Sequence, residues 1–327
     1  MTGSTESRHR IRVTRRLPDA VEARLAASYD AVFNVADTPL SAAELRDAVR
    51  DYDAIVPTIT DRLDAALMAV PERRARIFAN YGAGVDHIDL AAARTAGIAV
   101  TNTPGALTEA TAELAILLML MAARRAGEGE REVRAGAWTG WRPTHLVGQS
   151  LVGCTLGLIG FGRIAQRTAA KARGLGMNIR YFSRNPAAPE IEAALGATRD
   201  TSAEALVEQS DVLSLHVPGG AATHHFLDAG LLARAKPTAI VINTARGSVI
   251  DEAALVAALT EGRIAAAGLD VYESEPAVSA ALLAAPRTVL LPHLGSATRE
   301  SREAMGMQAV DNLDAFFAGR ALPDRVA

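Results

Sequence analysis

The sequence predicts an α/β protein with doubly wound parallel sheets. Short β-branched and apolar runs alternate with amphipathic stretches from one end of the chain to the other, which is typical of parallel strands joined by crossover helices. The chain has 327 residues, enough for about two domains, each with its own core. A glycine-spaced turn at residues 156–165 joins a strand to a helix, as the crossovers of such sheets require.

The first hundred residues contain five short apolar runs that predict strands. They cover residues 11–14, 31–35, 54–56, 76–80 and 99–101. Amphipathic segments, including residues 42–49 and 90–95, predict helices between them. The apolar face of residues 107–123 then predicts a longer helix, placed where two domains meet.

A second and stronger series of strands begins at residue 156. Six strands of one sheet are expected at residues 156–159, 179–182, 212–217, 239–243, 266–271 and 289–291. A helix over residues 301–317 follows the series and is expected to return to the first domain. We therefore expect two Rossmann-like or flavodoxin-like domains with a cleft between them, one formed by residues 1–103 and 296–327 and the other by residues 104–295.

Composition excludes several classes of protein. The net charge of −3 provides no general field for gathering nucleic acid, and 49% hydrophobic residues argue against disorder. The longest apolar run, residues 114–123, is half of what a bilayer span needs, so no membrane association is expected. The single cysteine, Cys154, forms no internal disulfide and fits a reducing compartment, for which the cytoplasm is the simplest choice.

The glycine turn at residues 156–165 predicts dinucleotide binding. Gly160 permits a tight turn, and Gly162 lets the backbone approach a pyrophosphate at the N-terminus of the following helix. Ala165 takes the third position, an allowed variant. The residues expected to contact the cofactor here are Gly160, Phe161, Gly162, Arg163 and Ile164. The domain of residues 104–295 is therefore expected to bind the dinucleotide, and the other domain the substrate.

The next strand ends without an acidic residue. Ser183, Arg184 and Asn185 stand where an Asp or Glu would bind the ribose 2′-hydroxyl of NAD, and Ser183 with Arg184 suits the 2′-phosphate of NADP. This favours NADP(H), with NAD(H) possible. The plainer alternative is that Arg184 is one of many solvated arginines.

Three polar residues follow strands of the second series and form a candidate catalytic set. Arg246 offers a cation for a carboxylate, His293 a proton donor near neutral pH, and Glu275 an acid that orients this donor. Taken singly, His293 could be a core histidine and Glu275 a turn cap. A second glycine turn, residues 80–86, could hold a carboxylate on its backbone N–H groups or simply be a tight turn.

No metal site is expected. Three histidines of the second domain have no cysteine or paired acidic residue at metal spacing: His216, His224 and His225.

These motifs resemble the D-isomer-specific 2-hydroxyacid dehydrogenases, and among them the glyoxylate/hydroxypyruvate reductases. The resemblance spans nearly the whole chain and rests on residues 80–86, 107–113, 141–143, 157–165, 243–247, 268–276 and 292–298. It implies that Arg246 binds the substrate carboxylate and carbonyl, that His293 is the general acid, and that Glu275 supports His293. Glu273 lies two residues earlier, but the family's acid immediately precedes proline, as Glu275 does.

The resemblance also implies further contacts. The backbone of Ala83 and Gly84 binds the substrate carboxylate, Thr58 and Trp141 shape the substrate pocket, and Asp270 binds the nicotinamide carboxamide. Trp141 reaches into a partner subunit, which implies a homodimer. The other residues expected in the cofactor site are Thr108, Pro218, Thr223, Thr244 and Gly295. The residues after the strand at 212–217, Pro218-Gly-Gly220, depart from the family's usual sequence.

The predicted activity is reduction of glyoxylate or hydroxypyruvate by NADPH, with His293 as general acid. One alternative is an NAD-dependent dehydrogenase of another D-2-hydroxy acid, because substrate side-chain selectivity is not readable from sequence. A binding protein of another class, similar to the dinucleotide-sensing corepressors related to this family, is the other alternative.

Overall fold

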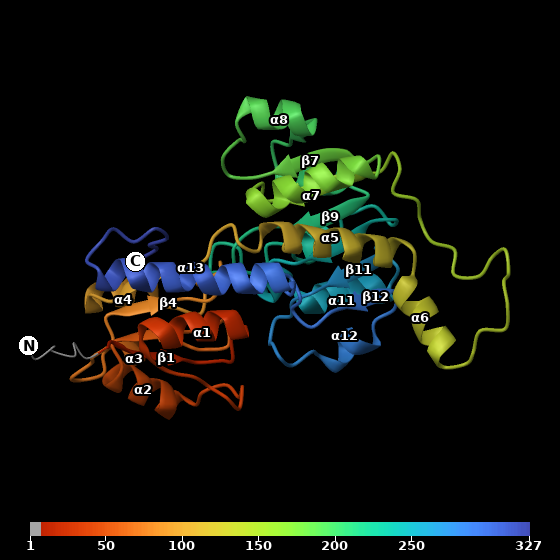
Figure 1. The fold of residues 1–327 in the computed structure, drawn as a ribbon. Helices are drawn as coiled ribbons and strands as arrows, with labels where there is room; N and C mark the ends of the chain where they lie inside the picture. The colour runs from red at the N-terminus through yellow and green to blue at the C-terminus, as the bar shows by residue number, and fades with distance from the viewer. Residues whose placement is uncertain (1–7) are drawn as a thin grey trace, which may run out of the picture. The chain divides into compact units, whose positions relative to one another are not determined.

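The computed structural model describes residues 8–327, which form two compact units (Figure 1). Unit 1 contains residues up to Leu107 together with Ala297–Ala327, and unit 2 contains Thr108–Ser296. The first seven residues of the predicted first domain lie outside the described part of the chain.

Unit 1 is built on a parallel sheet of five strands in the order β2-β1-β3-β4-β5. The strands are β1 (Arg10–Val13), β2 (Asp30–Val32), β3 (Ala54–Val56), β4 (Ile77–Ala79) and β5 (Ala99–Thr101). The helices are α1 (Asp19–Ser28), α2 (Ala42–Asp51), α3 (Ala65–Met68), α4 (Leu90–Ala96) and α13 (Arg299–Phe317). Sequence signals set their ends: Ser41 and Glu44 form a capping box that starts α2, and Gly97 ends α4 in the left-handed conformation.

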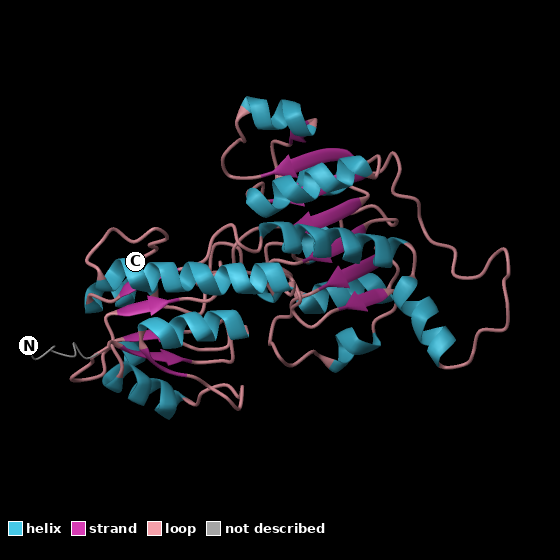
Figure 2. Ribbon diagram, viewed as in Figure 1, coloured by secondary structure: helices cyan, strands magenta, loops and turns pink. Residues whose placement is uncertain are grey.

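Helices cover both faces of this sheet, as Figure 2 shows. Because side chains alternate along a strand, Ile11 and Val13 of β1 pack against α1 and α13, whereas Ile55 of β3 and Phe78 of β4 pack against α2, α3 and α4. Helix α13 is the last helix of the chain and packs beside α1, which makes unit 1 discontinuous in sequence.

Unit 2 is built on a parallel sheet of seven strands in the order β12-β11-β10-β9-β6-β7-β8. The strands are β6 (Thr155–Ile159), β7 (Asn178–Phe182), β8 (Ala197–Arg199), β9 (Val212–Leu215), β10 (Ile240–Asn243), β11 (Ala266–Leu269) and β12 (Thr288–Leu290). Helices α5 (Thr108–Ala123) and α7 (Arg163–Gly174) cover one face. The opposite face is covered by α9 (Ala203–Gln209), α10 (Ala229–Leu232), α11 (Glu252–Thr260) and α12 (Ala280–Ala284).

The expectation of six strands in the second sheet was wrong, because β8 adds a seventh at the edge. Its three residues show no apolar alternation and are largely exposed, so no local pattern marks them. They form a strand because β7 lies alongside and because Arg180 of β7 pairs with Asp200 just after β8. The remaining elements of unit 2 are α6 (Ala126–Arg134), α8 (Pro189–Leu195) and the short 3-10 helix η1 (Gly247–Val249).

Within residues 8–327, no helix has the length and apolar character that crossing a membrane requires.

Candidate active site

The strand order of unit 2 reverses between β6 and β9, and this is where α/β sheets bind ligands. Gly160 follows β6 with φ of +87°, and a Cβ there would lie 2.6 Å from the carbonyl oxygen of His216, so only glycine fits. Among the described residues, a Cβ on Gly162 would meet nothing within 4 Å, and no side chain caps the N-terminus of α7. The turn thus offers open space and N–H donors, as a bound pyrophosphate requires.

The end of β7 is rich in positive charge. Arg184 is exposed, and within residues 8–327 it has no carboxylate partner. Arg199, from β8, donates to the carbonyl oxygens of Ser183 (3.0 Å) and Arg184 (3.4 Å). The Ser183 hydroxyl donates to the carbonyl oxygen of Asn185. The guanidinium groups of Arg184 and Arg199 therefore both lie at this turn. Arg199 was not predicted from the sequence, because β8 was not expected.

Other residues expected around the cofactor occupy distinct environments. The hydroxyl of Thr244 is buried and has no hydrogen-bond partner among the described residues, so it is available to a ligand. The Thr223 hydroxyl donates to the carbonyl oxygen of Pro218 (2.5 Å), which orders the loop after β9. Thr108 is the first residue of α5 and is half-buried. An open glycine turn and an orphaned hydroxyl together fit a dinucleotide.

The predicted catalytic residues meet at the carboxyl ends of β10, β11 and β12. Nδ1 of His293 lies 2.7 Å from Oε2 of Glu275, while Oε1 of Glu275 accepts from the backbone N–H of Tyr272 (3.0 Å). Burial opposes ionisation of Glu275, but hydrogen bonding and charge from His293 outweigh it, and Arg246 acts in the same direction, so the pKa of Glu275 is lowered. The carboxylate is therefore ionised at neutral pH and holds the imidazole in one orientation.

The loop that carries Arg246 is fixed by its neighbours. The buried side chain of Asn243 donates to the carbonyl oxygen of Arg246 (2.9 Å) and accepts from the backbone N–H of Ala245 (3.0 Å). A Cβ on Gly247 would lie 1.9 Å from the carbonyl carbon of Tyr272, so this loop and the segment carrying Glu275 touch backbone to backbone. Asn243 was not among the predicted site residues, although it lies inside the motif that predicted Arg246.

Asp270 supports the loop of His293. The buried carboxylate of Asp270 accepts from the backbone N–H groups of Leu294 (2.7 Å) and Gly295 (2.8 Å). The backbone carbonyl oxygen of Asp270 accepts from the backbone N–H of His293 (2.9 Å). Burial raises the pKa of Asp270 against the effect of these donors. His293 itself has φ of +54°, an uncommon conformation for a residue other than glycine. Within the protein, Asp270 thus fixes this conformation, whereas the resemblance assigned it only to the cofactor.

In unit 1, the turn after β4 presents backbone donors. Side chains of Asn80 and Asn102 hold its carbonyl oxygens: Nδ2 of Asn80 donates to Gly84 (2.9 Å), and Nδ2 of Asn102 donates to Ala83 (2.7 Å). Within the described chain, the N–H groups of Ala83 and Gly84 have no hydrogen-bond partner. An anion nest of this kind binds a carboxylate without a cationic side chain.

Thr58 follows β3, beside the point where the strand order of unit 1 reverses. The buried carboxylate of Asp61 accepts from the backbone N–H of Thr58 (2.8 Å) and from the hydroxyl of Thr14 (2.5 Å), so it joins the ends of β3 and β1. A hollow of about 470 Å³ is lined by residues 59–64 and 86–89. Four aspartates line this hollow and would repel an anion, so the N–H groups of Ala83 and Gly84 are the more favourable place for a carboxylate to bind.

Comparison with known proteins identifies the family. Residues 116–295 match the model of the NAD-binding domain of D-isomer specific 2-hydroxyacid dehydrogenases. The chain belongs to the D-isomer-specific 2-hydroxyacid dehydrogenases. It is 46% identical over 286 residues to a glyoxylate reductase of Thermococcus litoralis, covering 86% of each chain. It is 39% identical to a glycerate dehydrogenase of Hyphomicrobium methylovorum, covering 96% of this chain and 97% of the relative.

Solved structures of the family have the same fold. An NADPH-dependent glyoxylate/hydroxypyruvate reductase of Sinorhizobium meliloti, solved with NADP and malonate, aligns with a TM-score of 0.85 at 39% identity, covering 98% of this chain and 97% of that one. A glyoxylate reductase of Paecilomyes thermophila aligns with a TM-score of 0.87 at 35% identity, covering 98% and 99%. The protein is thus an NAD(P)-dependent D-2-hydroxyacid dehydrogenase of the glyoxylate/hydroxypyruvate reductase branch, which confirms the predicted family, fold class and enzyme class.

Proposed function

We propose that this dehydrogenase reduces glyoxylate to glycolate and hydroxypyruvate to D-glycerate, with NADPH as the preferred cofactor. The observation that carries the proposal is the bond of 2.7 Å between Nδ1 of His293 and Glu275, beside Arg246. The similar proteins named glyoxylate reductase and glycerate dehydrogenase support this choice of substrates.

The bound nicotinamide supplies the hydride for this reaction. Glu275 holds Nδ1 of His293, which leaves Nε2 to donate a proton to the carbonyl oxygen of the substrate. Arg246 binds the substrate carboxylate and polarises the carbonyl. The free N–H groups of Ala83 and Gly84 bind a carboxylate oxygen. Thr58 and Trp141 limit the size of the substrate side chain.

The proposed preference for NADPH is based on the polar and positively charged residues that follow β7. A 2′-phosphate would be bound by Ser183, Arg184 and Asn185, with Arg199 adding charge, and none of residues 183–185 is acidic and would repel it. The rest of the proposed cofactor site consists of residues after β6, β9, β10, β11 and β12 and at the start of α5: Thr108, Gly160, Phe161, Gly162, Arg163, Ile164, Pro218, Thr223, Thr244, Asp270 and Gly295.

The test is a set of initial rates with glyoxylate and hydroxypyruvate, each with NADPH and NADH. We expect oxidation of NADPH with both acids, at a kcat/KM at least tenfold above that with NADH. Turnover with NADH alone would contradict the cofactor assignment. Absence of turnover with all four pairs would contradict the substrate assignment and favour another D-2-hydroxy acid.

We also propose that the enzyme works as a homodimer. The segment between α6 and β6 runs away from the sheet of unit 2 (Figure 1). Some of its apolar side chains are exposed: Trp141 is 82% exposed and Val147 65%. A second copy of the chain would cover them. Light scattering after size-exclusion chromatography should give twice the chain mass, and Trp141→Ser should lower both dimer stability and activity. A monomer with full activity would contradict this.

A further inference from the structure

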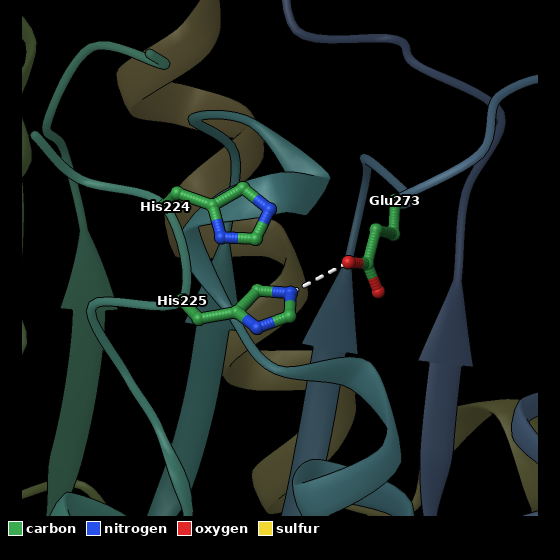
Figure 3. Close-up of side chains that lie close together, drawn as sticks. All are labelled: His224, His225 and Glu273. Carbon is green, nitrogen blue, oxygen red and sulfur yellow. Dashed lines mark hydrogen bonds and ion pairs between the residues drawn. The ribbon is translucent and has the colours of Figure 1, made fainter. Parts of the chain in front are cut away.

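Two histidines and a glutamate lie close together beside the candidate catalytic residues of unit 2. Ligand atoms of His224, His225 and Glu273 are all within 4.8 Å of one another, and the carboxylate of Glu273 faces Nε2 of His225 at 2.6 Å (Figure 3). We propose that these three side chains bind a divalent transition-metal ion, with Zn²⁺ as the representative ion.

The donor set fits this chemistry. Two imidazoles and one carboxylate bind Zn²⁺ in known proteins and leave a fourth position for water. Bonds of about 2.0–2.2 Å in a tetrahedral site place ligand atoms about 3.3–3.5 Å apart. The His225–Glu273 separation is 2.6 Å and the other separations are at most 4.8 Å, so the site closes on an ion with side-chain shifts of about an ångström. His225 and Glu273 are each 34% exposed and have room for them.

The segments that carry the ligands are held in place. His225 has φ of +49°, and its backbone N–H donates to the carbonyl oxygen of Ser248 (2.8 Å). The two imidazole rings are stacked with centroids 4.0 Å apart, so both present their nitrogen atoms near Glu273 (Figure 3). Glu273 follows β11, where the tight approach at Gly247 fixes its backbone. The backbone of both ligand-bearing segments is therefore fixed, and only the side chains have to adjust to an ion.

This cluster is separate from the pair proposed for catalysis. Glu275 is engaged by His293, whereas Glu273 faces His225, so the two acids of the segment after β11 serve different histidines. Sequence spacing concealed the cluster, because Glu273 is 48 residues from His225.

A second histidine–glutamate pair of the same unit provides a matched control. Nε2 of His145 lies 3.0 Å from Oε2 of Glu132, but the guanidinium of Arg142 donates to Nδ1 of His145 (2.8 Å). This pair supplies one imidazole and one carboxylate next to a cation, so we expect it to form an ion pair without binding a metal.

The experiment is a calorimetric titration of tag-free, metal-stripped protein with ZnCl₂ in a non-chelating buffer, with the melting temperature measured in parallel. We expect one site per chain, a rise in Tm on saturation, and at least tenfold weaker binding in both His224→Gln and Glu273→Gln. His145→Gln should bind Zn²⁺ as the unchanged protein does. Co²⁺ in place of Zn²⁺ should give the visible absorption of a tetrahedral site, lost in the first two variants.

Activity without metal checks that the variants fold, because none of the three substituted residues is assigned to catalysis or to the cofactor. Unchanged Zn²⁺ affinity in His224→Gln and Glu273→Gln would overturn the proposal and place any binding elsewhere, for example at His293 and Glu275. An equal loss in His145→Gln and His224→Gln would overturn it too. If one of the two ligand variants fails to fold, the other still decides the outcome.

Discussion

Replacement of Glu275 by glutamine tests how much the orientation of His293 contributes to the reaction. In Glu275→Gln the amide oxygen can still accept from the backbone N–H of Tyr272, as Oε1 does now at 3.0 Å. The amide NH₂ group would then face Nδ1 of His293, where a carboxylate oxygen stands at 2.7 Å. The substitution therefore removes the charge and reverses the hydrogen bond while keeping the shape of the side chain.

The size of the effect follows from this bond. A hydrogen bond to a charged group contributes about 1.5–3 kcal/mol. At about 1.36 kcal/mol per factor of ten, its loss from the transition state lowers kcat/KM about 10- to 150-fold. The side chains of His293 and Glu275 are 28% and 31% exposed, so solvent weakens their interaction. We therefore expect a loss of kcat/KM in the lower half of that range.

Steady-state oxidation of NADPH with glyoxylate measures the loss of kcat/KM. A fluorescence titration measures NADPH affinity, which should stay within about twofold of that of the unchanged enzyme because Glu275 is not among the residues proposed to bind the cofactor. Glu273→Gln is the matched control. It changes an acid two residues away that faces His225 at 2.6 Å, and it should keep activity in metal-free buffer. Equal losses of kcat/KM in Glu275→Gln and Glu273→Gln, or a loss of kcat/KM below twofold in Glu275→Gln, would refute the role of Glu275 in orienting His293.

Three other predictions follow from the structure. Ser183→Asp combined with Arg184→Ala should move the ratio of kcat/KM toward NADH by at least tenfold, and an unchanged ratio would contradict the assignment of the 2′-phosphate site. Burial lowers the pKa of His216 to about 4. Between pH 6.5 and pH 4 this histidine is therefore protonated in the unfolded chain but not in the native protein, so the free energy of unfolding should fall by up to about 3 kcal/mol as the pH drops through this range. Urea midpoints at pH 7 and pH 5 should show a smaller decrease in His216→Gln. Gly247→Ala places a Cβ 1.9 Å from the backbone of Tyr272 and should lower stability by at least about 1–3 kcal/mol and lower activity as well. Gly174→Ala is the control: its Cβ would meet nothing within 4 Å among residues 8–327, so this variant should unfold at or above the normal temperature.

Local signals were sufficient for most of the architecture. Strands such as β3 and β10 are short and wholly buried, so their apolar β-branched runs stand out between polar helix caps. The turn at Gly160 was equally readable, because strand, turn and helix are contiguous and the conformation at +87° admits only glycine. Family membership followed from the order of many such motifs along the chain.

The approach of Arg246, Glu275 and His293 to one another was predictable for a different reason. Each follows a strand of the same parallel sheet, and the carboxyl ends of parallel strands share one edge. Which acid faces His293 was inferred from a neighbouring proline and the resemblance, since Glu273 and Glu275 offer the same chemistry two residues apart. In the folded protein, Glu275 lies against His293 and Glu273 against His225.

Other contacts were decided by tertiary structure alone. Strand β8 forms only because β7 lies beside it, and it brings Arg199 to the turn at Ser183. The cluster of His225 with Glu273 likewise depends on two loops that meet after strands far apart in sequence. Sequence by itself determined most of the elements, their order and the turn chemistry, because these depend on side-chain periodicity and backbone freedom within a few residues. The pairing of particular charges depends on the register and packing of strands that are not neighbours in the chain, and only the folded protein decides it.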